Sequence, residues 1–489
     1  MNIAELIVFI LYFIIVLAIG FVFYNKTKGG GEMEYFLGGR AMSGMVAALS
    51  AGASDMSSWV LMGLPAAIFA VGLGKVWIAI GLGIGTVLSW IFVAPRLRRF
   101  SIVADNSITI PQFLTNRFKS SSKALQIICA VLFLVVYAIY AASSIKACGI
   151  LFNTVIGIDQ TVAMYIAAAI IILYTFLGGF SAVCWTDFFQ GILMLFALMA
   201  TPIVVLFFVK ADPGAQAVVL ADNYWNFLPS GKFDWSSVSS ILSGLGWGLG
   251  YFGMPHIIIR YMSIKSPFEV KKSRIIGSTW TCLILIFSVA VGLIAHKILV
   301  GLEDSSLVFI TMVRKVFPSL ISGIMLSAIL AAAMSTADSQ LLASASAFAS
   351  DVYKPVFRKN ASDKEMLLIG RAVVMLVSVA ALIIASSPNS GSIMDLVENA
   401  WGLFGAAFGP VILLSLFWRK LTFKGTVAGI VAGGAVDALW LVFFSETGLY
   451  EILPGFAAGI IAAVIFSKIG KGASKEVEKL FDASVAYEE

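Results

Sequence analysis

Long apolar runs limit the folds open to this chain more than any other feature of its sequence. A membrane-spanning helix needs about 20 apolar residues, and about thirteen runs approach or exceed that length. They cover residues 4–24, 42–71, 75–95, 124–156, 160–178, 183–209, 237–262, 276–300, 319–350, 365–386, 395–418, 424–445 and 449–467. Charged residues make up 12% of the chain, against about 25% in soluble domains, and the mean hydropathy is +0.97. We therefore predict an all-α polytopic membrane protein with about thirteen transmembrane helices.

Lysine and arginine residues concentrate in alternate loops between these runs. The loops after the first, third, seventh, ninth and eleventh runs and the C-terminal tail hold most of them, including Arg96, Arg98 and Arg99. The positive-inside rule makes these loops cytoplasmic, which places the N-terminus outside and the C-terminus in the cytoplasm. That orientation requires an odd number of spans. The first run follows MNIAEL, which lacks a basic segment and a cleavage site, so we predict a retained helix and not a signal peptide.

Two of the runs contain sequences that disfavour a continuous helix. Residues 51–59 read AGASDMSSW, and residues 243–255 contain five glycines and end in a proline. An ionised carboxylate at the bilayer centre costs about 2.5–3.5 kcal/mol, and irregular backbone is tolerated at that depth only where protein or water covers it. Interrupted helices at corresponding positions of two halves indicate a transporter binding site near the membrane midplane.

The interrupted runs are the second and the seventh, and this five-helix spacing fits an inverted repeat. Glycines that only permit close helix packing are the alternative, but they do not account for Asp55 or for the spacing.

We predict a first helix and cytoplasmic loop at residues 1–41, and a first repeat with an outside loop at 42–236. A second repeat at 237–420, two further helices at 421–468 and a cytoplasmic tail at 469–489 complete the chain.

Several segments resemble the sodium:solute symporter family, and the likeness is greatest to its bacterial sodium/proline branch. They read LSAGASDMSSWVLMGLPAA, WIAIGLGIGTVLSWIFVAPRLR, LGWGLGYFGMPHIIIRYM, LSAILAAAMSTADSQLLASASAFASD and WGLFGAAFGPVILLSLFW. The resemblance implies a LeuT-type fold with one helix before a ten-helix core and two after it. It also implies Na⁺-coupled uptake of L-proline by alternating access in a bacterial-type cytoplasmic (inner) membrane. The partners it implies are Na⁺, a small solute and the lipid bilayer, and the chain is expected to act as a monomer.

The resemblance assigns Na⁺ ligands to two helices. The carbonyls of Ala53 and Met56 match one half of the family's site, and the carbonyl of Ala332 with the hydroxyls of Ser335 and Thr336 matches the other. Residues 332, 335 and 336 share one helical face. The alternative role for the two hydroxyls is bonding to a carbonyl one turn earlier. Asp55 matches an aspartate needed for Na⁺ binding, directly or at longer range.

Substrate contacts follow from the same resemblance. The matching positions are Ser57, Ser58, Tyr140, Trp247, Tyr251 and Pro255. Ser58 departs from the familiar proline symporters, which have glycine there, so another ligand that uses this hydroxyl stays open. The alternative role for the aromatic residues is ordinary core packing.

Three residues match a second cation site present in some relatives, namely Asp187, Asp338 and Ser339. Asp338 is a carboxylate where other members carry a hydroxyl, and two neighbouring carboxylates repel unless a cation or a proton lies between them. A second Na⁺, a salt bridge and a proton all remain open. Arg40 matches a residue tied to coupling and is also a cytoplasmic anchor by the positive-inside rule.

Four other functions compete with proline symport. A symporter of pantothenate, sialic acid, a sugar or a monocarboxylate would keep the fold and change the cargo. A membrane sensor would need a signalling domain, and the tail after Lys468 is too short for one. A channel would need a continuous pore lined by charge rings. An enzyme is not expected, because the sequence shows no nucleophile–base pair or metal cluster.

Overall fold

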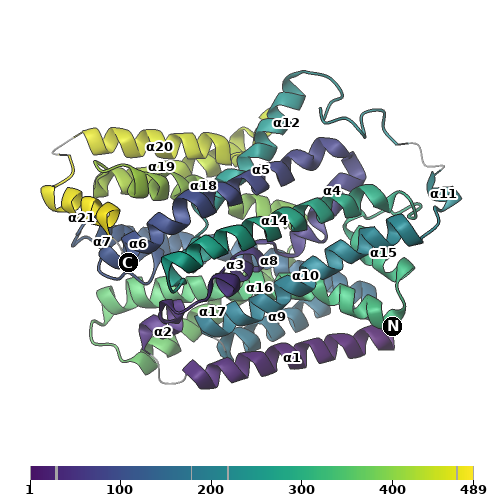
Figure 1. The fold of residues 1–489 in the computed structure, drawn as a ribbon, viewed down its shortest axis with the longest axis horizontal. Helices are drawn as coiled ribbons and strands as arrows, with labels where there is room; N and C mark the ends of the chain where they lie inside the picture. Colours follow the sequence, from purple (N-terminus) through teal and green to yellow (C-terminus); the bar gives the residue numbers. More distant parts are fainter. Residues whose placement is uncertain (1, 28–30, 178, 217–219, 470–471, 488–489) are drawn as a thin grey trace.

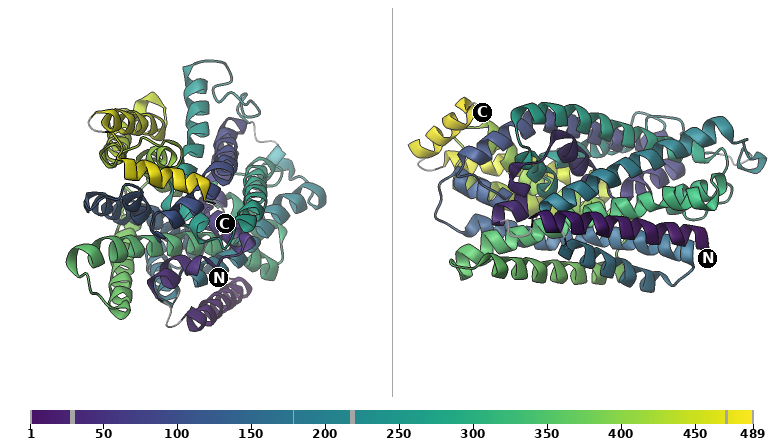
Figure 2. Two further views of the ribbon diagram at one scale, coloured as in Figure 1. Left: turned by 60° about the vertical axis from the view of Figure 1, so that its left-hand side comes forward. Right: turned by 60° about the horizontal axis from the view of Figure 1, so that its bottom comes forward.

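The computed structural model describes residues 2–27, 31–177, 179–216, 220–469 and 472–487, and over these ranges the protein is all-helical. The only β pairing in this part of the chain is an isolated bridge between Met42 and Ile264. The helices lie roughly along one direction and form an elongated bundle (Figure 1). The two ends of the described chain lie at opposite ends of that bundle in Figure 1 and in the right-hand view of Figure 2.

Nine helical segments among the described residues are long and apolar enough to cross a membrane. They are Ile3–Phe23, Leu73–Val103, Ala124–Ile156, Phe180–Phe208, Pro267–Ala295, Ser319–Phe357, Asp363–Ser386, Ile393–Phe417 and Phe423–Phe443. A tenth consists of two helices with a bend of 73° between them, Gly44–Asp55 and Ser58–Val71. The shorter helices α9 (Gln160–Leu177) and α20 (Ile452–Lys468) and the broken segment Trp235–Ser263 correspond to the other three predicted spans. The count of thirteen crossings therefore stays a prediction.

Some element boundaries differ from those predicted. The run at 75–95 continues through α5 (Val76–Leu88), the π-helical turn η4 (Ser89–Val93) and α6 (Ala94–Val103), because the amphipathic segment after it is also helical. The following loop contains α7 (Ile110–Arg117), and the tail contains α21 (Lys475–Ala486). The predicted run 160–178 ends at a residue outside the described ranges. Short helices α2 (Glu32–Leu37), α11 (Pro213–Gln216) and α15 (Val308–Val316) fill other connections.

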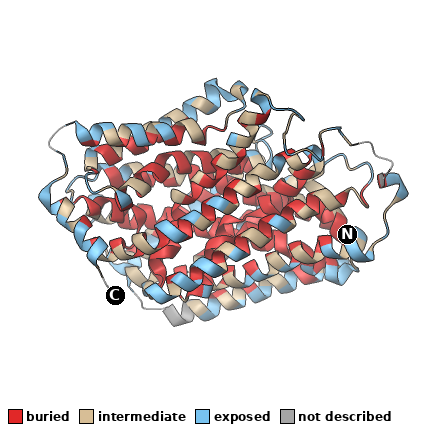
Figure 3. Ribbon diagram, turned by 45° about the horizontal axis from the view of Figure 1, so that its top comes forward, coloured by how far each residue is buried: buried red, intermediate tan, exposed pale blue. Residues whose placement is uncertain are grey.

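The central helix of the bundle is α16 (Ser319–Phe348), in which every residue from Met325 to Ala347 is buried. It packs against α1 (Ile3–Thr27), α8 (Ala124–Ile156) and α10 (Phe180–Phe208). The outer faces of the bundle are exposed apolar surface, and buried residues fill its centre (Figure 3). The apolar outer surface distinguishes the protein from a soluble domain and fits a helix bundle solvated by lipid.

The two interrupted runs meet at the centre of the bundle. The first consists of α3 (Gly44–Asp55), the short 3₁₀ turn η2 (Ser58–Val60) and α4 (Gly63–Val71). The second consists of α12 (Trp235–Gly246), the 3₁₀ helix η5 (Trp247–Phe252) and α13 (Pro255–Ser263). Helix α3 packs against α13, α10, α14 (Pro267–Ala295) and α16. The remaining long helices are α17 (Asp363–Ser386), α18 (Ile393–Phe417) and α19 (Phe423–Phe443).

Candidate functional site

The first break lies where the sequence predicted it. Helix α3 begins after Ser43, whose hydroxyl caps the amide of Val46, and it ends at Asp55. Met56 has ψ of 69° and Ser57 is extended with ψ of −169°, so neither is helical. The side chains at the break do not bond to the local backbone: the Asp55 carboxylate bonds to Tyr251 on η5, and the hydroxyls of Ser57 and Ser58 have no hydrogen-bond partner among the described residues. The break turns backbone carbonyls away from the helix axis.

The second break follows from glycine and proline. The glycine-rich stretch winds as the tighter η5 helix, and Gly253 and Met254 separate it from α13. Pro255 occupies the first turn of α13, where its missing amide hydrogen costs no helical hydrogen bond. Trp247, Tyr251 and Pro255 are all buried.

Oxygen atoms from the first break and from α16 lie next to each other. The hydroxyl of Ser335 donates to the carbonyl of Ala53 at 2.8 Å and lies 3.2 Å from the carbonyl of Ala332. The hydroxyl of Thr336, one residue along, is buried without a hydrogen-bond partner. Met56, three residues after Ala53, is fully buried. This arrangement gathers neutral oxygen donors, which hard monovalent cations prefer.

Asp55 connects the two broken segments. Its carboxylate accepts a hydrogen bond from the hydroxyl of Tyr251 on η5. Its backbone carbonyl accepts from the Tyr140 hydroxyl on α8 and from the Trp59 indole, both at 3.3 Å. The second carboxylate oxygen, Oδ1, is buried without a hydrogen-bond partner. The side chain is thus held toward the predicted substrate residues and not hydrogen-bonded to Ser335.

Aromatic rings cover the breaks on the side of η5. Trp247 lies between Trp59, with ring centroids 6.1 Å apart, and Tyr450, with centroids 5.3 Å apart. The Trp401 indole donates to the carbonyl of Trp247 at 2.8 Å and packs edge-on against Tyr251. The hydroxyls of Ser57 and Ser58 are buried without partners. The structure therefore gathers the predicted Ser57, Ser58, Tyr140, Trp247 and Tyr251 around one apolar and aromatic region.

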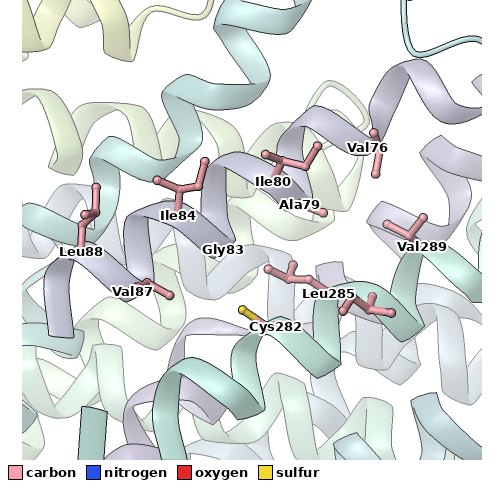
Figure 4. A pocket seen from close by; sticks show the side chains of 11 residues that line it. Val76, Ala79, Ile80, Gly83, Ile84, Val87, Leu88, Cys282, Leu285 and Val289 are labelled. Atoms are coloured by element: carbon pink, nitrogen blue, oxygen red, sulfur yellow. The ribbon is translucent and has the colours of Figure 1, made fainter. Parts of the chain in front are cut away.

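A polar cavity of about 590 Å³ leads to this region, and we call it the vestibule. Its lining includes Trp247, Tyr450, Lys75, Glu398 and Glu451. A second hollow of about 550 Å³ lies between α5 and α14 and is lined by apolar residues such as Ile80, Ile84 and Leu285 and by Cys282 (Figure 4). A zwitterionic solute would find no charged or strongly polar partner in that apolar hollow, so the vestibule is the better route to the site.

Asp187 lies in a buried ionic network. Its Oδ2 is 2.9 Å from the Arg260 guanidinium and accepts from Ser50 at 2.7 Å. The same guanidinium donates to Ser339 at 2.5 Å, and the Ser339 hydroxyl lies 3.3 Å from Asp338. Both side chains of the ion pair are at most 2% exposed. Arg260 thus brings a positive charge to the three residues predicted as a second cation site.

Arg40 joins three segments at the end of the bundle where α3 begins. Its guanidinium donates to the carbonyls of Met262 at 2.6 Å and Ser107 at 2.7 Å. It also donates to the side chains of Ser101 and Asn106, both at 3.0 Å. These bonds connect the start of the first broken segment to the end of the second and to the connection between α6 and α7.

Arg260, Trp401 and Tyr450 are parts of the site that the sequence reasoning missed. An arginine inside an apolar run is an intramembrane charge, which by default marks a functional or paired position, so Arg260 carried a usable signal. Trp401 and Tyr450 carried none, because the chain contains 11 tryptophans and 13 tyrosines and only the fold shows which of them contact η5.

Comparisons with known proteins agree with this architecture. The model of the sodium:solute symporter family matches residues 35–433. The osmoregulated proline transporter OpuE of Bacillus subtilis is 43% identical over 477 residues, covering 96% of each chain. The sodium/proline symporter of Escherichia coli is 41% identical over 490 residues, covering 99% of this chain and 96% of that protein.

Solved structures extend the comparison to the fold. A Na⁺-coupled sialic acid symporter in a substrate-bound outward-open state matches with a TM-score of 0.80 at 20% identity, covering 96% of this chain and 99% of that one. Mhp1, a nucleobase-cation-symport-1 family transporter, matches with a TM-score of 0.56 at 16% identity, covering 92% and 98%. These matches confirm the predicted LeuT-type helical fold. With the family match over most of its length, the chain belongs to the sodium:solute symporter family.

Proposed function

We propose that this protein is a secondary active transporter that carries L-proline into the cell together with Na⁺ by alternating access. Relatives above 40% identity that span nearly the whole chain are named as proline transporters or sodium/proline symporters. Inward Na⁺ movement releases about 2.3 kcal/mol per charge per 100 mV, which can drive accumulation of a neutral zwitterion. In this proposal the protein acts as a monomer, catalyses no chemical reaction and lies in the cytoplasmic (inner) membrane of a bacterium.

The observation that carries the proposal is the hydrogen bond from Ser335 to the carbonyl of Ala53. It brings a hydroxyl of α16 to a carbonyl released by the first break, across 282 residues of sequence. In our proposal Na⁺ binds between these two oxygens, and the Ser335 hydroxyl keeps its proton but turns it away so that its oxygen faces the ion. The carbonyls of Met56 and Ala332 and the hydroxyl of Thr336 complete its ligands. Neutral oxygens can hold Na⁺ and still release it, because no full opposing charge has to be separated from it.

Proline then binds beside the ion, against Trp247, Tyr251, Pro255 and Tyr140. A compact apolar ring suits this aromatic wall, and the unpartnered hydroxyls of Ser57 and Ser58 are available to the polar groups of the solute. Asp55 couples the two occupants in this scheme. Its backbone belongs to the break that supplies the Na⁺ ligands, and its carboxylate holds the Tyr251 hydroxyl.

Alternating access would arise from movement of two structural repeats, residues 42–236 and 237–420. Arg40 is the proposed gate at the cytoplasmic end, because its hydrogen bonds to Met262 and Ser107 must break when the two broken segments separate there. In this proposal the positive-inside rule places the N-terminus outside the cell and the C-terminus in the cytoplasm.

At Asp187, Asp338 and Ser339 we propose that the Arg260 guanidinium serves as the cation. The ion pair of 2.9 Å with Asp187 and the contact with Ser339 support this role over a second Na⁺. A Na⁺ ion placed there would have to compete with a fixed positive charge.

Equilibrium binding of labelled L-proline to the purified protein tests the proposal. We expect saturable binding in NaCl that is lost in KCl, and a binding affinity reduced by at least about tenfold in Trp247→Ala, because a buried aromatic contact is worth about 1.4 kcal/mol or more. Na⁺-dependent binding that unlabelled sialic acid or pantothenate displaces and proline does not would contradict the choice of cargo. The buried hydroxyl of Ser58 makes Ser58→Gly the variant to compare in that case.

A further inference from the structure

A groove on the outer surface of the bundle lies between α14 and the continuous helix formed by α5, η4 and α6. It contains the apolar hollow of about 550 Å³ described above (Figure 4). A further hollow of about 460 Å³, which we call the basic hollow, has Arg98, Arg99, Lys271 and Arg274 in its lining. Ile84 and Ile286, which line the apolar hollow, are 51% and 60% exposed, so this hollow opens toward the lipid.

One face of α14 lines both hollows. Its residues recur every three or four positions, and they are Lys271, Arg274, Ser278, Cys282, Leu285 and Val289. All of them except Ser278 line one of the two hollows. On the opposite side of the groove, Trp90 of η4 lines the basic hollow, is 3% exposed and packs its ring on Gly277 of α14. The two hollows are therefore successive parts of one groove, with Trp90 as the floor between them.

The basic hollow concentrates positive charge without an acidic partner. No aspartate or glutamate is among the described residues that line it. Lys271 and Arg274 are exposed and form no ion pair with another described residue. The carboxylate of Glu269, the nearest acidic residue in sequence, instead accepts from the Gly44 amide at 2.5 Å and lies 3.6 Å from Lys265. Like charges that share one hollow repel each other, so an anion bound among them would be stabilised.

The position of the basic hollow fits the headgroup level of a membrane. Phe268 and Ile275, which flank its basic residues on α14, are 73% and 66% exposed. Exposed apolar and basic side chains occur side by side where a helix leaves the bilayer. Leu285 follows Arg274 by 11 positions, which is about 16 Å along the helix, and one leaflet of hydrocarbon is about 15 Å thick. The groove thus has the length of one leaflet and carries its charge at one end.

We propose that this groove binds one anionic glycerophospholipid, with the phosphate among Arg99, Lys271 and Arg274 and an acyl chain in the apolar hollow. Guanidinium and ammonium groups both suit phosphate oxygens, and basic pockets between transmembrane helices on the cytoplasmic side are typical sites for anionic headgroups. Arg98 belongs to the wall, because it is buried and donates to the carbonyl of Ile264 at 2.5 Å.

The inference does not depend on proline being the cargo. In the orientation proposed above, the lipid comes from the cytoplasmic leaflet. Helix α5 packs against η5 and α14 packs against α3, so a lipid in the groove contacts the two helices that support the breaks.

Native mass spectrometry of the full-length protein tests the site, with phosphatidylglycerol and phosphatidylcholine of identical acyl chains as probes. We expect tighter binding of phosphatidylglycerol. Its affinity should fall about fivefold for each charge removed in Lys271→Gln and Arg274→Gln, as expected for one basic side chain beside anionic lipid. Lys272→Gln is the matched control, because it removes the same charge from the next position of α14, which does not line the hollow.

A second pair of variants tests the apolar part of the groove. A Cβ atom at Gly83 meets nothing within 4 Å, so the phenyl group of Gly83→Phe should fill the apolar hollow and weaken the binding of both lipids. Val131→Phe is the control, because Val131 is 54% exposed on α8, away from the groove.

Three results would overturn the proposal. Equal binding of the two lipids, or a preference that Lys271→Gln and Arg274→Gln leave unchanged, would show only unselective lipid contact. Displacement of phosphatidylglycerol by millimolar inorganic phosphate, together with unchanged binding in Gly83→Phe, would indicate a soluble anion. A preference that appears only after Glu488→Gln and Glu489→Gln would assign the basic hollow to the acidic residues that follow Tyr487. The charge variants alter exposed side chains, so they decide the question if Gly83→Phe does not elute as a single species.

Discussion

At the scale of single residues, the site depends on polar atoms placed where helices stop. Ser57 and Ser58 are buried at the first break, and Ser335 and Thr336 are buried in the middle of α16. Of these four hydroxyls only that of Ser335 has a hydrogen-bond partner among the described residues. Their spacing was readable from the sequence, since positions 332, 335 and 336 share one face of a helix. The choice between ion binding and bonding within the helix could not be made from the sequence. The Ser335 hydroxyl contacts both the carbonyl of Ala53 and, within its own helix, the carbonyl of Ala332, so its role as a Na⁺ ligand stays a prediction.

Ser335→Ala should weaken Na⁺ binding while leaving the fold intact. Removal of one oxygen ligand is expected to raise the Na⁺ concentration for half-maximal proline binding at least about tenfold, since a charge-assisted contact is worth about 1.5–3 kcal/mol. The matched control is Ser327→Ala on the same helix, whose buried hydroxyl bonds only to the carbonyl of Gly323 in the helix itself. Equal Na⁺ dependence in the two variants would remove Ser335 from the ligand set.

Asp187→Asn should destabilise the protein strongly. The substitution leaves the buried Arg260 guanidinium without its charged partner, and breaking a buried ion pair in this way costs about 3–5 kcal/mol. Asp212→Asn is the control. The side chains of the Lys315–Asp212 pair are 44% and 35% exposed, so the loss of this pair is expected to leave the unfolding temperature nearly unchanged. Thermal unfolding in detergent measures both. A variant that unfolds like the wild type yet binds Na⁺ more weakly would instead support a second cation at Asp187.

At the scale of helices, composition predicted the breaks and their position but not their packing. Glycine, serine and aspartate in runs 42–71 and 237–262 explain why each segment divides. The 73° bend of the first and the 3₁₀ winding of the second depend on neighbouring helices, which a single run does not reveal. Trp401 is part of the site because α18 packs against η5, and that contact joins residues 154 positions apart.

Close contact of α5 with η5 supports the second break, and Gly85→Ala should disturb it. A Cβ atom at Gly85 would overlap the backbone of Gly248, and overpacking of this kind costs about 1–3 kcal/mol. We expect lower thermal stability and reduced proline binding. Gly83→Ala on the same helix is the control, because a Cβ there meets nothing within 4 Å and the position faces the hollow of Figure 4. An equal loss of thermal stability and proline binding in both variants would indicate that alanine alters α5 itself and that the contact with η5 is not the cause.

At the scale of the whole molecule, the sequence predicted a polytopic α-helical symporter, and the family match and the LeuT-type fold confirm it. Hydropathy predicts the polytopic helical fold well, because membrane-spanning helices must be long and apolar. Hydropathy predicts the short amphipathic helices poorly. Helix α21 packs against α6 and α7, and α7 also packs against α8, so no apolar run in the sequence predicts either helix.

The attachment of α21 to the bundle should depend on Arg419 and on pH. Arg419 contacts Asp482 at 2.8 Å and Glu478 at 2.9 Å, and its hydrogen bond lowers the pKa of Asp482. Since a lowered pKa in the folded state stabilises the attachment only above the unfolded value, protection of residues 475–486 from hydrogen exchange should fall as the pH drops below about 4. Arg419→Ala should reduce that protection at neutral pH, and Lys479→Ala should not. Unchanged exchange in Arg419→Ala would show that apolar packing alone holds the helix.

Uptake of labelled L-proline into proteoliposomes tests the account as a whole. The protein should accumulate proline when an inward Na⁺ gradient is imposed and should fail to do so when K⁺ replaces Na⁺. Asp55→Ala should abolish this accumulation, because it removes the carboxylate that joins the first break to Tyr251. Accumulation that persists without a Na⁺ gradient, or that Asp55→Ala leaves intact, would contradict Na⁺-coupled transport through the two broken helices.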